Sequence, residues 1–184
     1  MQMVHEKEAY SFNMAYQQNN SFMRQPSEFV EDIVQISRIS KKTKGGNKIS
    51  FSALAVVGDK KGKVGVAHAK AADVASAIRK AVSAAKKHFI EVPMVNGTIP
   101  FDITVKRDAA RVMLKPAPTG SGIIAGGAVR SVVVAAGIQN ISSKVLGSSN
   151  PASNVYAAME ALKTIGILHQ KVQLRKAKRK LKNK

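Results

Sequence analysis

Residues 49–69, ISFSALAVVGDKKGKVGVAHA, contain two strand-like runs separated by a turn. From Ile49 to Val57 every second residue is apolar, which is the pattern of a strand with one buried face. Residues 58–62, GDKKG, have the glycines of a tight turn, and a further strand follows them. The preceding run, 33–44, is rich in β-branched residues and leads into a Lys-Gly-Gly-Asn turn. Three strands joined by short turns predict an antiparallel meander.

A helix is predicted directly after this meander. Asp73 is suited to cap its first turn. Apolar residues recur at helical spacing from Val74 to Phe89, and cations lie on the opposite face. Such a separation predicts that one face packs on the sheet while the other faces solvent or RNA. The cations of that face are Arg79, Lys80, Lys86 and Lys87.

A second unit follows a boundary at residues 92–97. Asn150 or Ser149 is expected to cap its last helix, with Pro151 in the first turn. The element order is therefore β-β-β-α followed by β-β-α-β-α, an α+β chain of two small domains. The elements expected in the second unit are strands at 99–105, 111–115 and 138–146 and helices at about 127–136 and 151–168.

The sequence divides into four segments. Residues 1–28 form a polar lead-in that is expected to be flexible, because it lacks hydrophobic periodicity. Residues 29–95 and 96–168 form the two domains. Residues 169–184 contain eight Lys and Arg residues and no acid. Repulsion between these like charges predicts a disordered tail that becomes ordered along RNA.

The charge distribution is the strongest indication of function. The 184 residues include 30 Lys and Arg against 11 Asp and Glu, a formal net charge of +19, yet 45% are hydrophobic, enough to build cores. Clustered cations on a chain that can fold are typical of proteins that bind the phosphate backbone of a nucleic acid. The clusters lie at 38–48, 60–63, 79–87, 106–115 and 169–184.

Several classes of function are disfavoured. The chain has no cysteine, which excludes thiolate metal sites and thiol nucleophiles and fits a reducing compartment. Its four histidines are isolated in sequence. The glycines at 120 and 122 follow a proline-rich segment rather than a strand, so they do not form a dinucleotide motif. No membrane span or signal peptide is evident. We therefore expect no catalytic residue, metal or cofactor.

A set of short motifs runs in unbroken order over residues 33–162. The motifs are KGG at 44–46, VVGD at 56–59, KVG at 63–65, EVPMVNGTIP at 91–100, KPA at 115–117, GIIAGGAVR at 122–130 and LGSSNP at 146–151. Together they resemble the bacterial small-subunit ribosomal protein S5 family. The chain departs from the family pattern at Lys60, where a glycine is usual, and at Ser153, where an asparagine is usual. The lead-in and the basic tail lie outside the resemblance.

The resemblance implies a fold and a role. The first domain would resemble a double-stranded-RNA-binding domain without its first helix, and the second would contain a left-handed β-α-β crossover. The chain would be a non-enzymatic, monomeric constituent of the cytoplasmic small ribosomal subunit. It would bind ribosomal RNA near the decoding centre and near the point where messenger RNA enters, beside ribosomal proteins S4 and S8.

Residues matching the family's functional segments are the candidate site. The loop at 38–48 would reach RNA near the spectinomycin site, and the segment at 122–130 would face S4, a contact tied to decoding accuracy. Arg130 lies early in its predicted helix, where the helix dipole favours anions and does not stabilise a cation. We therefore expect Arg130 to contact a partner. The candidate RNA-binding residues are Arg38, Lys41, Lys42, Thr43, Lys44, Gly45, Gly46, Lys48, Lys60, Lys61, Lys63, Lys70, Lys86 and Lys87. The candidate protein-interface residues are Gly122, Gly126, Gly127 and Arg130.

Two other functions compete with this one. A nucleotide phosphotransferase would need a serine-rich helix start at the glycine loop and a nearby acid for magnesium, and neither is visible. A free double-stranded-RNA-binding regulator would not need a second glycine-rich domain. Sedimentation with small ribosomal subunits would distinguish this regulator from a ribosomal protein.

Overall fold

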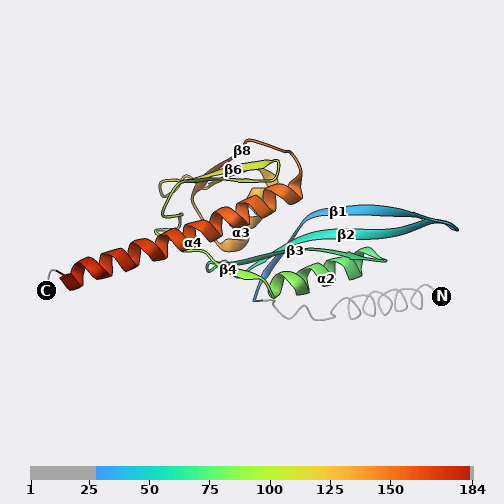
Figure 1. Cartoon of the computed structure of the whole chain (residues 1–184), viewed down its shortest axis with the longest axis horizontal. Coiled ribbons are helices and arrows are strands. Elements are labelled where there is room, and N and C mark those ends of the chain that lie inside the picture. The colour runs from blue at the N-terminus through green and yellow to red at the C-terminus, as the bar shows by residue number, and fades with distance from the viewer. Residues whose placement is uncertain (1–27, 183–184) are drawn as a thin grey trace, which may run out of the picture.

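The computed structural model describes residues 28–182, and its first domain is a four-stranded antiparallel sheet with one helix (Figure 1). The strands lie in the order β1-β2-β3-β4. The predicted meander and the helix after it are confirmed, whereas the short strand β4 was not predicted. The elements are β1 (Val30–Thr43), β2 (Gly46–Gly58), β3 (Lys63–Ala71), α2 (Val74–Lys86) and β4 (Phe89–Glu91). The lead-in that was expected to be flexible lies outside the described residues, except for Glu28.

The second domain contains another four-stranded sheet and two helices. The strands are β5 (Ile103–Arg107), β6 (Ala110–Pro116), β7 (Ile123–Ile124) and β8 (Ile141–Val145), in the order β5-β6-β8-β7. Strand β7 pairs in parallel with β8, and α3 (Gly127–Ala136) connects them, which gives a β-α-β unit. The hand of this crossover is an implication of the resemblance alone.

Two predicted strands of the second domain were too long. Residues 99–102 and 138–140 lie outside the strands, although Ile99 and Ile138 are each only 1% exposed. Ile99 and Ile138 are therefore apolar because they are buried in the core, and not because they pair in a strand. Periodicity cannot separate these two causes in short apolar runs.

The central part of the first sheet, residues 52–58 of β2 and most of β3, is covered on both faces. One face packs against α2 through small residues, among them Ala53, Ala55 and Ala81. The other face packs against the second domain, so that Leu54 and Val56 share one core with residues of α3. The prediction that β2 is half-buried is therefore wrong for residues 52–58, which are buried throughout. Because one core crosses the domain boundary, the two domains form a single packed body.

The ends of α2 show how local sequence sets its limits. The Ser76 amide donates to Asp73 Oδ2 at 2.9 Å, which confirms the predicted N-cap. This hydrogen bond lowers the pKa of the Asp73 carboxyl below its usual value. The helix ends at Lys86, so Phe89 belongs to β4 rather than to the helix, and its ring stacks on Phe29 with the centroids 5.4 Å apart.

The last helix is much longer than predicted. Helix α4 (Pro151–Lys182) begins with Asn150 Oδ1 accepting from the Ala152 amide at 3.1 Å, so of the two candidate caps Asn150 makes the bond. The prediction of a disordered tail is wrong for residues 169–182, which continue the helix. Its first half is anchored by buried residues such as Leu162 and Ile165. Adding a turn to an existing helix avoids the nucleation cost, and the Lys, Arg, Gln and Leu residues of the tail favour helix. The helix dipole also favours cations at this end.

Candidate nucleic-acid interface

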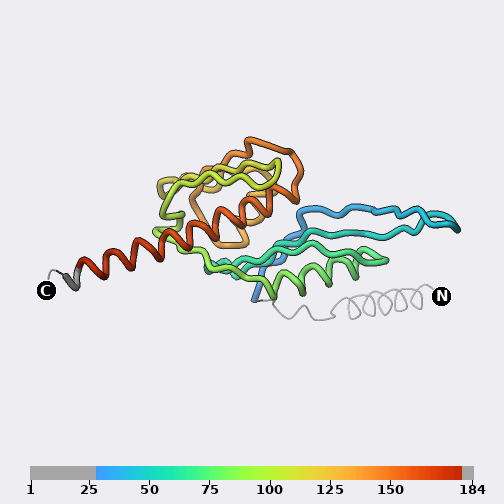
Figure 2. Tube along the Cα trace, viewed as in Figure 1, coloured from blue at the N-terminus to red at the C-terminus, as the bar shows by residue number. Residues whose placement is uncertain are grey.

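Strands β1 and β2 form a long hairpin whose free end extends past α2 and β3 (Figure 2). The two strands pair as far as Thr43 and Gly46, so that only Lys44 and Gly45 form the turn. The Thr43 hydroxyl donates to the Gly46 carbonyl oxygen at 2.8 Å and closes the turn. Gly46 has a φ of +130°, a conformation that few residues other than glycine adopt. We call residues 38–48 the hairpin tip.

The hairpin tip carries cations without a compensating acid. Residues 33–58 contain no Asp or Glu. Lys41 and Lys48 face each other directly across the two strands, an arrangement of like charges that is destabilising in isolation. A bound polyanion would relieve this repulsion. The exposed cations of the tip are Arg38, Lys41, Lys42, Lys44 and Lys48.

A second group of candidate residues lies at the other end of β2, on the order of 40 Å away for a strand of this length. The Lys60 amide donates to the Ala135 carbonyl at 3.1 Å, and the Gly62 amide donates to the Ala136 carbonyl at 3.0 Å. These bonds satisfy carbonyls at the C-terminal end of α3 that have no partner within the helix. Residues 58–62 are therefore a joint between the domains, which we call the domain joint.

The domain joint depends on glycine. A Cβ atom on Gly58 would overlap the carbonyl oxygen of Ala135, and one on Gly137 would overlap the carbonyl oxygen of Lys60. The sequence marked Gly58 only as part of a turn. The residue that Gly58 approaches, Ala135, is nearly eighty positions away in the chain, so local sequence patterns could not reveal this contact. The lysine side chains of the joint point outward and are exposed, and Lys63 Nζ lies 3.6 Å from Glu91 Oε1.

Asp59 fixes the shape of the domain joint. Its Oδ1 accepts from the amides of Lys61 and Lys63 at 2.7 and 2.9 Å. Slight burial raises the pKa of the Asp59 carboxyl, but these hydrogen bonds outweigh that effect and hold the pKa below its ordinary value of 3.8. The ionised carboxylate therefore stabilises the fold at pH values above about 4. This contribution is lost as the pH falls through the lowered pKa.

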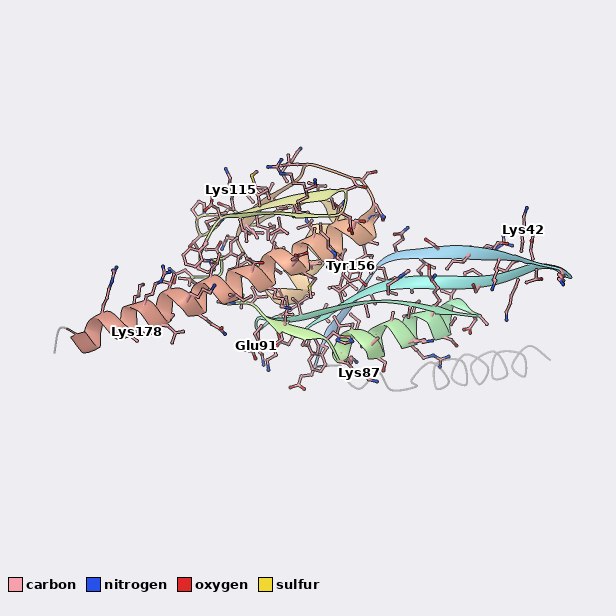
Figure 3. All side chains as sticks on the ribbon, viewed as in Figure 1. Lys42, Lys87, Glu91, Lys115, Tyr156 and Lys178 are labelled. Carbon is pink, nitrogen blue, oxygen red and sulfur yellow. The ribbon has the colours of Figure 1, made fainter. Side chains whose placement is uncertain are left out.

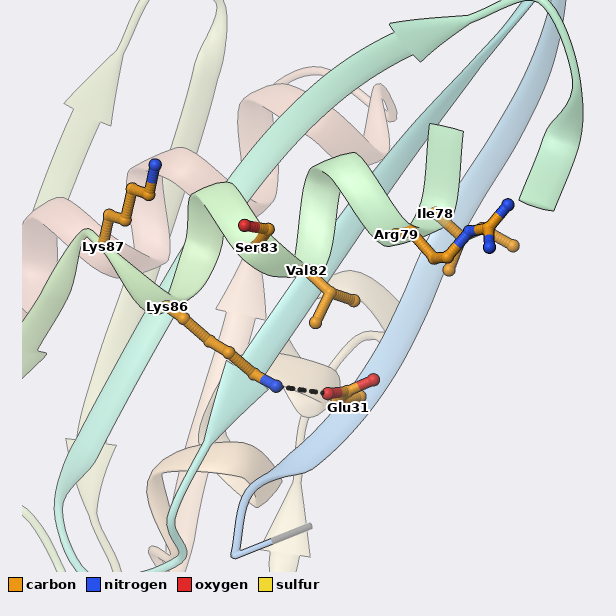
Figure 4. Close-up of a pocket in the computed structure, with 7 residues that line it drawn as sticks. All are labelled: Glu31, Ile78, Arg79, Val82, Ser83, Lys86 and Lys87. Carbon is orange, nitrogen blue, oxygen red and sulfur yellow. Dashed lines mark ion pairs between the residues drawn. The ribbon is translucent and has the colours of Figure 1, made fainter. Parts of the chain in front are cut away.

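The cationic face of α2 is only partly free. Lys86 Nζ lies 2.8 Å from Glu31 Oε1 of β1 (Figure 4). The same Nζ lies 5.7 Å from the centre of the Phe29 ring. Lys86 thus has an acidic partner that the helix sequence alone could not reveal. Lys70 and Lys87 are exposed, and neither forms an ion pair among the residues that the structure describes.

Of the candidate protein-interface residues, Gly126, Gly127 and Arg130 lie at the start of α3, and Gly122 lies in the loop before β7. Asn140, only 5% exposed, accepts at Oδ1 from the Gly120 amide at 3.0 Å and the Gly122 amide at 3.1 Å. The Arg130 guanidinium donates through Nη2 to the Ile123 carbonyl at 2.8 Å. Arg130 therefore has an intrachain role, bracing β7, that was not predicted from its position in the helix. Asn140 was not predicted either, because a lone asparagine carries no sequence signal.

Asn140→Leu is expected to destabilise the protein by about 2 kcal/mol, because two loop amides would lose their acceptor. Thermal unfolding of the full chain measures this change. Asn140→Asp keeps the accepting oxygen and is the matched control, with a smaller expected loss. Equal melting temperatures for Asn140→Leu and the unchanged protein would show that this loop does not depend on Asn140.

The candidate residues therefore do not form one surface but lie in four places: the hairpin tip, the domain joint, the cationic face of α2 and the segment leading into α3. Figure 3 places Lys42 of the hairpin tip and Lys178 of α4 near opposite ends of the molecule.

Within residues 28–182, no helix is long and apolar enough to cross a membrane. Nor do three or more His, Asp or Glu side chains of the described residues come close enough to hold a metal ion.

Comparison with known proteins identifies the family. A family model for the N-terminal domain of ribosomal protein S5 matches residues 29–93, and one for the C-terminal domain matches residues 105–178. The chain belongs to the ribosomal protein S5 family. The resemblance found in the sequence is thereby confirmed. The C-terminal match reaches residue 178, so much of the basic segment, which had been placed outside the resemblance, lies within it.

Relatives of known identity agree with this assignment. The small ribosomal subunit protein uS5 of Thermotoga maritima is 55% identical over 141 residues, which cover 77% of this chain and 79% of the relative. That of Thermosipho africanus is 52% identical over 148 residues, covering 80% of this chain and 84% of the relative. That of Chloroflexus aurantiacus is 50% identical over 143 residues, covering 78% and 80%.

Proposed function

We propose that this chain, a structural and non-enzymatic constituent of the small ribosomal subunit, binds ribosomal RNA through the hairpin tip. Its membership of the ribosomal protein S5 family supports this role. The observation that carries the RNA contact is the exposed, acid-free cluster of cations on a projecting hairpin. Cations of this kind bind phosphates and position the protein, and they do not read bases. The tip would lie near the spectinomycin site.

The start of α3 is the proposed contact with a neighbouring protein. Asn140 orders the loop at 120–122, and Arg130 braces β7 while remaining exposed. An ordered, exposed surface loses little entropy on binding. In line with the resemblance, we assign this surface to ribosomal protein S4 and to decoding accuracy. Ribosomal protein S8 and the incoming messenger RNA are further proposed neighbours. No observation on the described residues favours a free double-stranded-RNA-binding regulator.

Arg130→Leu is expected to raise stop-codon readthrough several-fold in cells that depend on the variant. The substitution removes an exposed cation and one hydrogen bond, so it should cost only about 1 kcal/mol of stability. Readthrough of a reporter and the melting temperature of the purified protein are the two measurements. Arg130→Lys keeps the charge and is the control. Normal melting together with unaltered readthrough would contradict the proposed contact.

A further inference from the structure

The end of α4 leaves the body of the protein. Ile165 is fully buried, and Gly166 packs beside Glu91 and Pro93 of the first domain. Beyond this point Ile167 is 46% exposed and Leu174 63% exposed. Figure 1 shows the helix extending past both sheets. We call residues 167–182 the C-terminal arm, a helical segment about 24 Å long.

The C-terminal arm is cationic and has no acid to balance it. The last acidic residue of the chain is Glu160, which precedes the arm and lies 3.9 Å from Arg107. Within the described residues, no ion pair involves the arm. Its exposed cations up to residue 179 are Lys171, Arg175, Lys176, Lys178 and Arg179.

These cations lie on one side of the helix. At about 100° per residue, they fall within an arc of roughly 160°. On the remaining arc of roughly 200°, Lys180 is the one cation of the arm, and the other positions there carry neutral side chains. These neutral residues include Gln170, Gln173, Leu174 and Ala177. A charged tail without structure would have no such faces, so the arrangement has meaning only because the segment is helical.

We infer that the C-terminal arm binds ribosomal RNA as a preformed helix, with its cationic face against the phosphates. The inference rests on the proposed function and adds a binding mode to it. A polyanion suits a surface that has five cations and no acid. The helix already holds these cations on one face, so less conformational entropy is lost on binding than for a disordered tail.

A composition-preserving swap tests the inference in the full-length protein. Leu174→Arg with Arg175→Leu, and Ala177→Lys with Lys178→Ala, move two cations to the neutral face without changing net charge or composition. Binding to transcribed small-subunit ribosomal RNA should weaken about tenfold at moderate salt. The slope of log affinity against log salt should fall by about 1.5, the value for two lost phosphate contacts. The matched control, Lys178→Arg with Arg179→Lys, keeps the face and should bind within about twofold of the unchanged protein.

A second pair of variants isolates the helix from its charges. Gln173→Pro interrupts the arm and retains every cation, so it should weaken binding as the swap does, whereas Gln173→Ala should not. If the unchanged protein binds and the swap matches it in affinity and slope, the arm does not bind RNA through one helical face, and the inference is overturned. Its cationic face would then be open to an acidic protein surface. If the unchanged protein does not bind the RNA at all, the proposed function itself fails.

Discussion

Gly58→Ala is expected to lower the free energy of unfolding of the whole protein by about 3 kcal/mol. Gly58 ends β2 inside the core that the two domains share, and a methyl group there would overlap the carbonyl oxygen of Ala135. The overlap would push the domain joint away from α3. The amides of Lys60 and Gly62 would then lose their carbonyl partners on that helix. Few substitutions that add a single methyl group should cost as much.

Urea unfolding of the full-length protein measures this loss. Gly45→Ala, at the hairpin turn, is the matched control, because no atom lies within 4 Å of the added Cβ and its φ is not positive. It should leave the midpoint unchanged or raise it slightly. Because the domains share one core, Gly58→Ala should shift a single transition that includes both. A midpoint equal to that of Gly45→Ala would mean that the domain joint does not hold the domains together.

Replacing the four lysines of the hairpin tip by glutamine should weaken binding to small-subunit ribosomal RNA about 100-fold at moderate salt. The salt slope should fall by about 3, because about four phosphate contacts would be lost. The substituted residues are Lys41, Lys42, Lys44 and Lys48. Removing the opposed pair Lys41 and Lys48 relieves repulsion, so the melting temperature should stay equal or rise.

The four lysine-to-arginine substitutions form the control for this experiment. They keep the charge and the extended strands, and their affinity should stay within a few-fold of that of the unchanged protein. Filter binding or fluorescence anisotropy over a range of salt concentrations gives both quantities. If the glutamine substitutions change neither the affinity nor the salt slope, the hairpin tip does not bind the RNA, and its positive charge has another cause.

Features that depend on neighbouring residues could be predicted from the sequence. The meander, the cap at Asp73 and the cap at Asn150 follow from turn residues, alternation and capping side chains a few positions apart. The hairpin tip was also predicted, because its charge and its glycines lie within one short segment. The two-domain organisation followed from the boundary at residues 92–97, and the resemblance supplied the family.

Features that depend on distant residues could not be predicted in this way. The second buried face of β2 and the role of Gly58 exist only once α3 lies against the first sheet. Lys86 pairs with Glu31 because the fold brings α2 beside β1, and the two residues are not neighbours along one helix. Like-charge repulsion predicts disorder for the tail as an isolated peptide, whereas the packed first half of α4 provides the nucleus from which that segment continues as a helix.

The central claim is that this chain is a structural constituent of the small ribosomal subunit. Sedimentation of a tagged full-length protein from cells through a sucrose gradient tests it most directly. We expect the tagged protein to migrate with the small subunit and to stay bound after a wash at moderate salt, held by phosphate contacts and by its protein neighbours. Recovery of the protein only at the top of the gradient, in cells whose small subunits are intact, would contradict the claim.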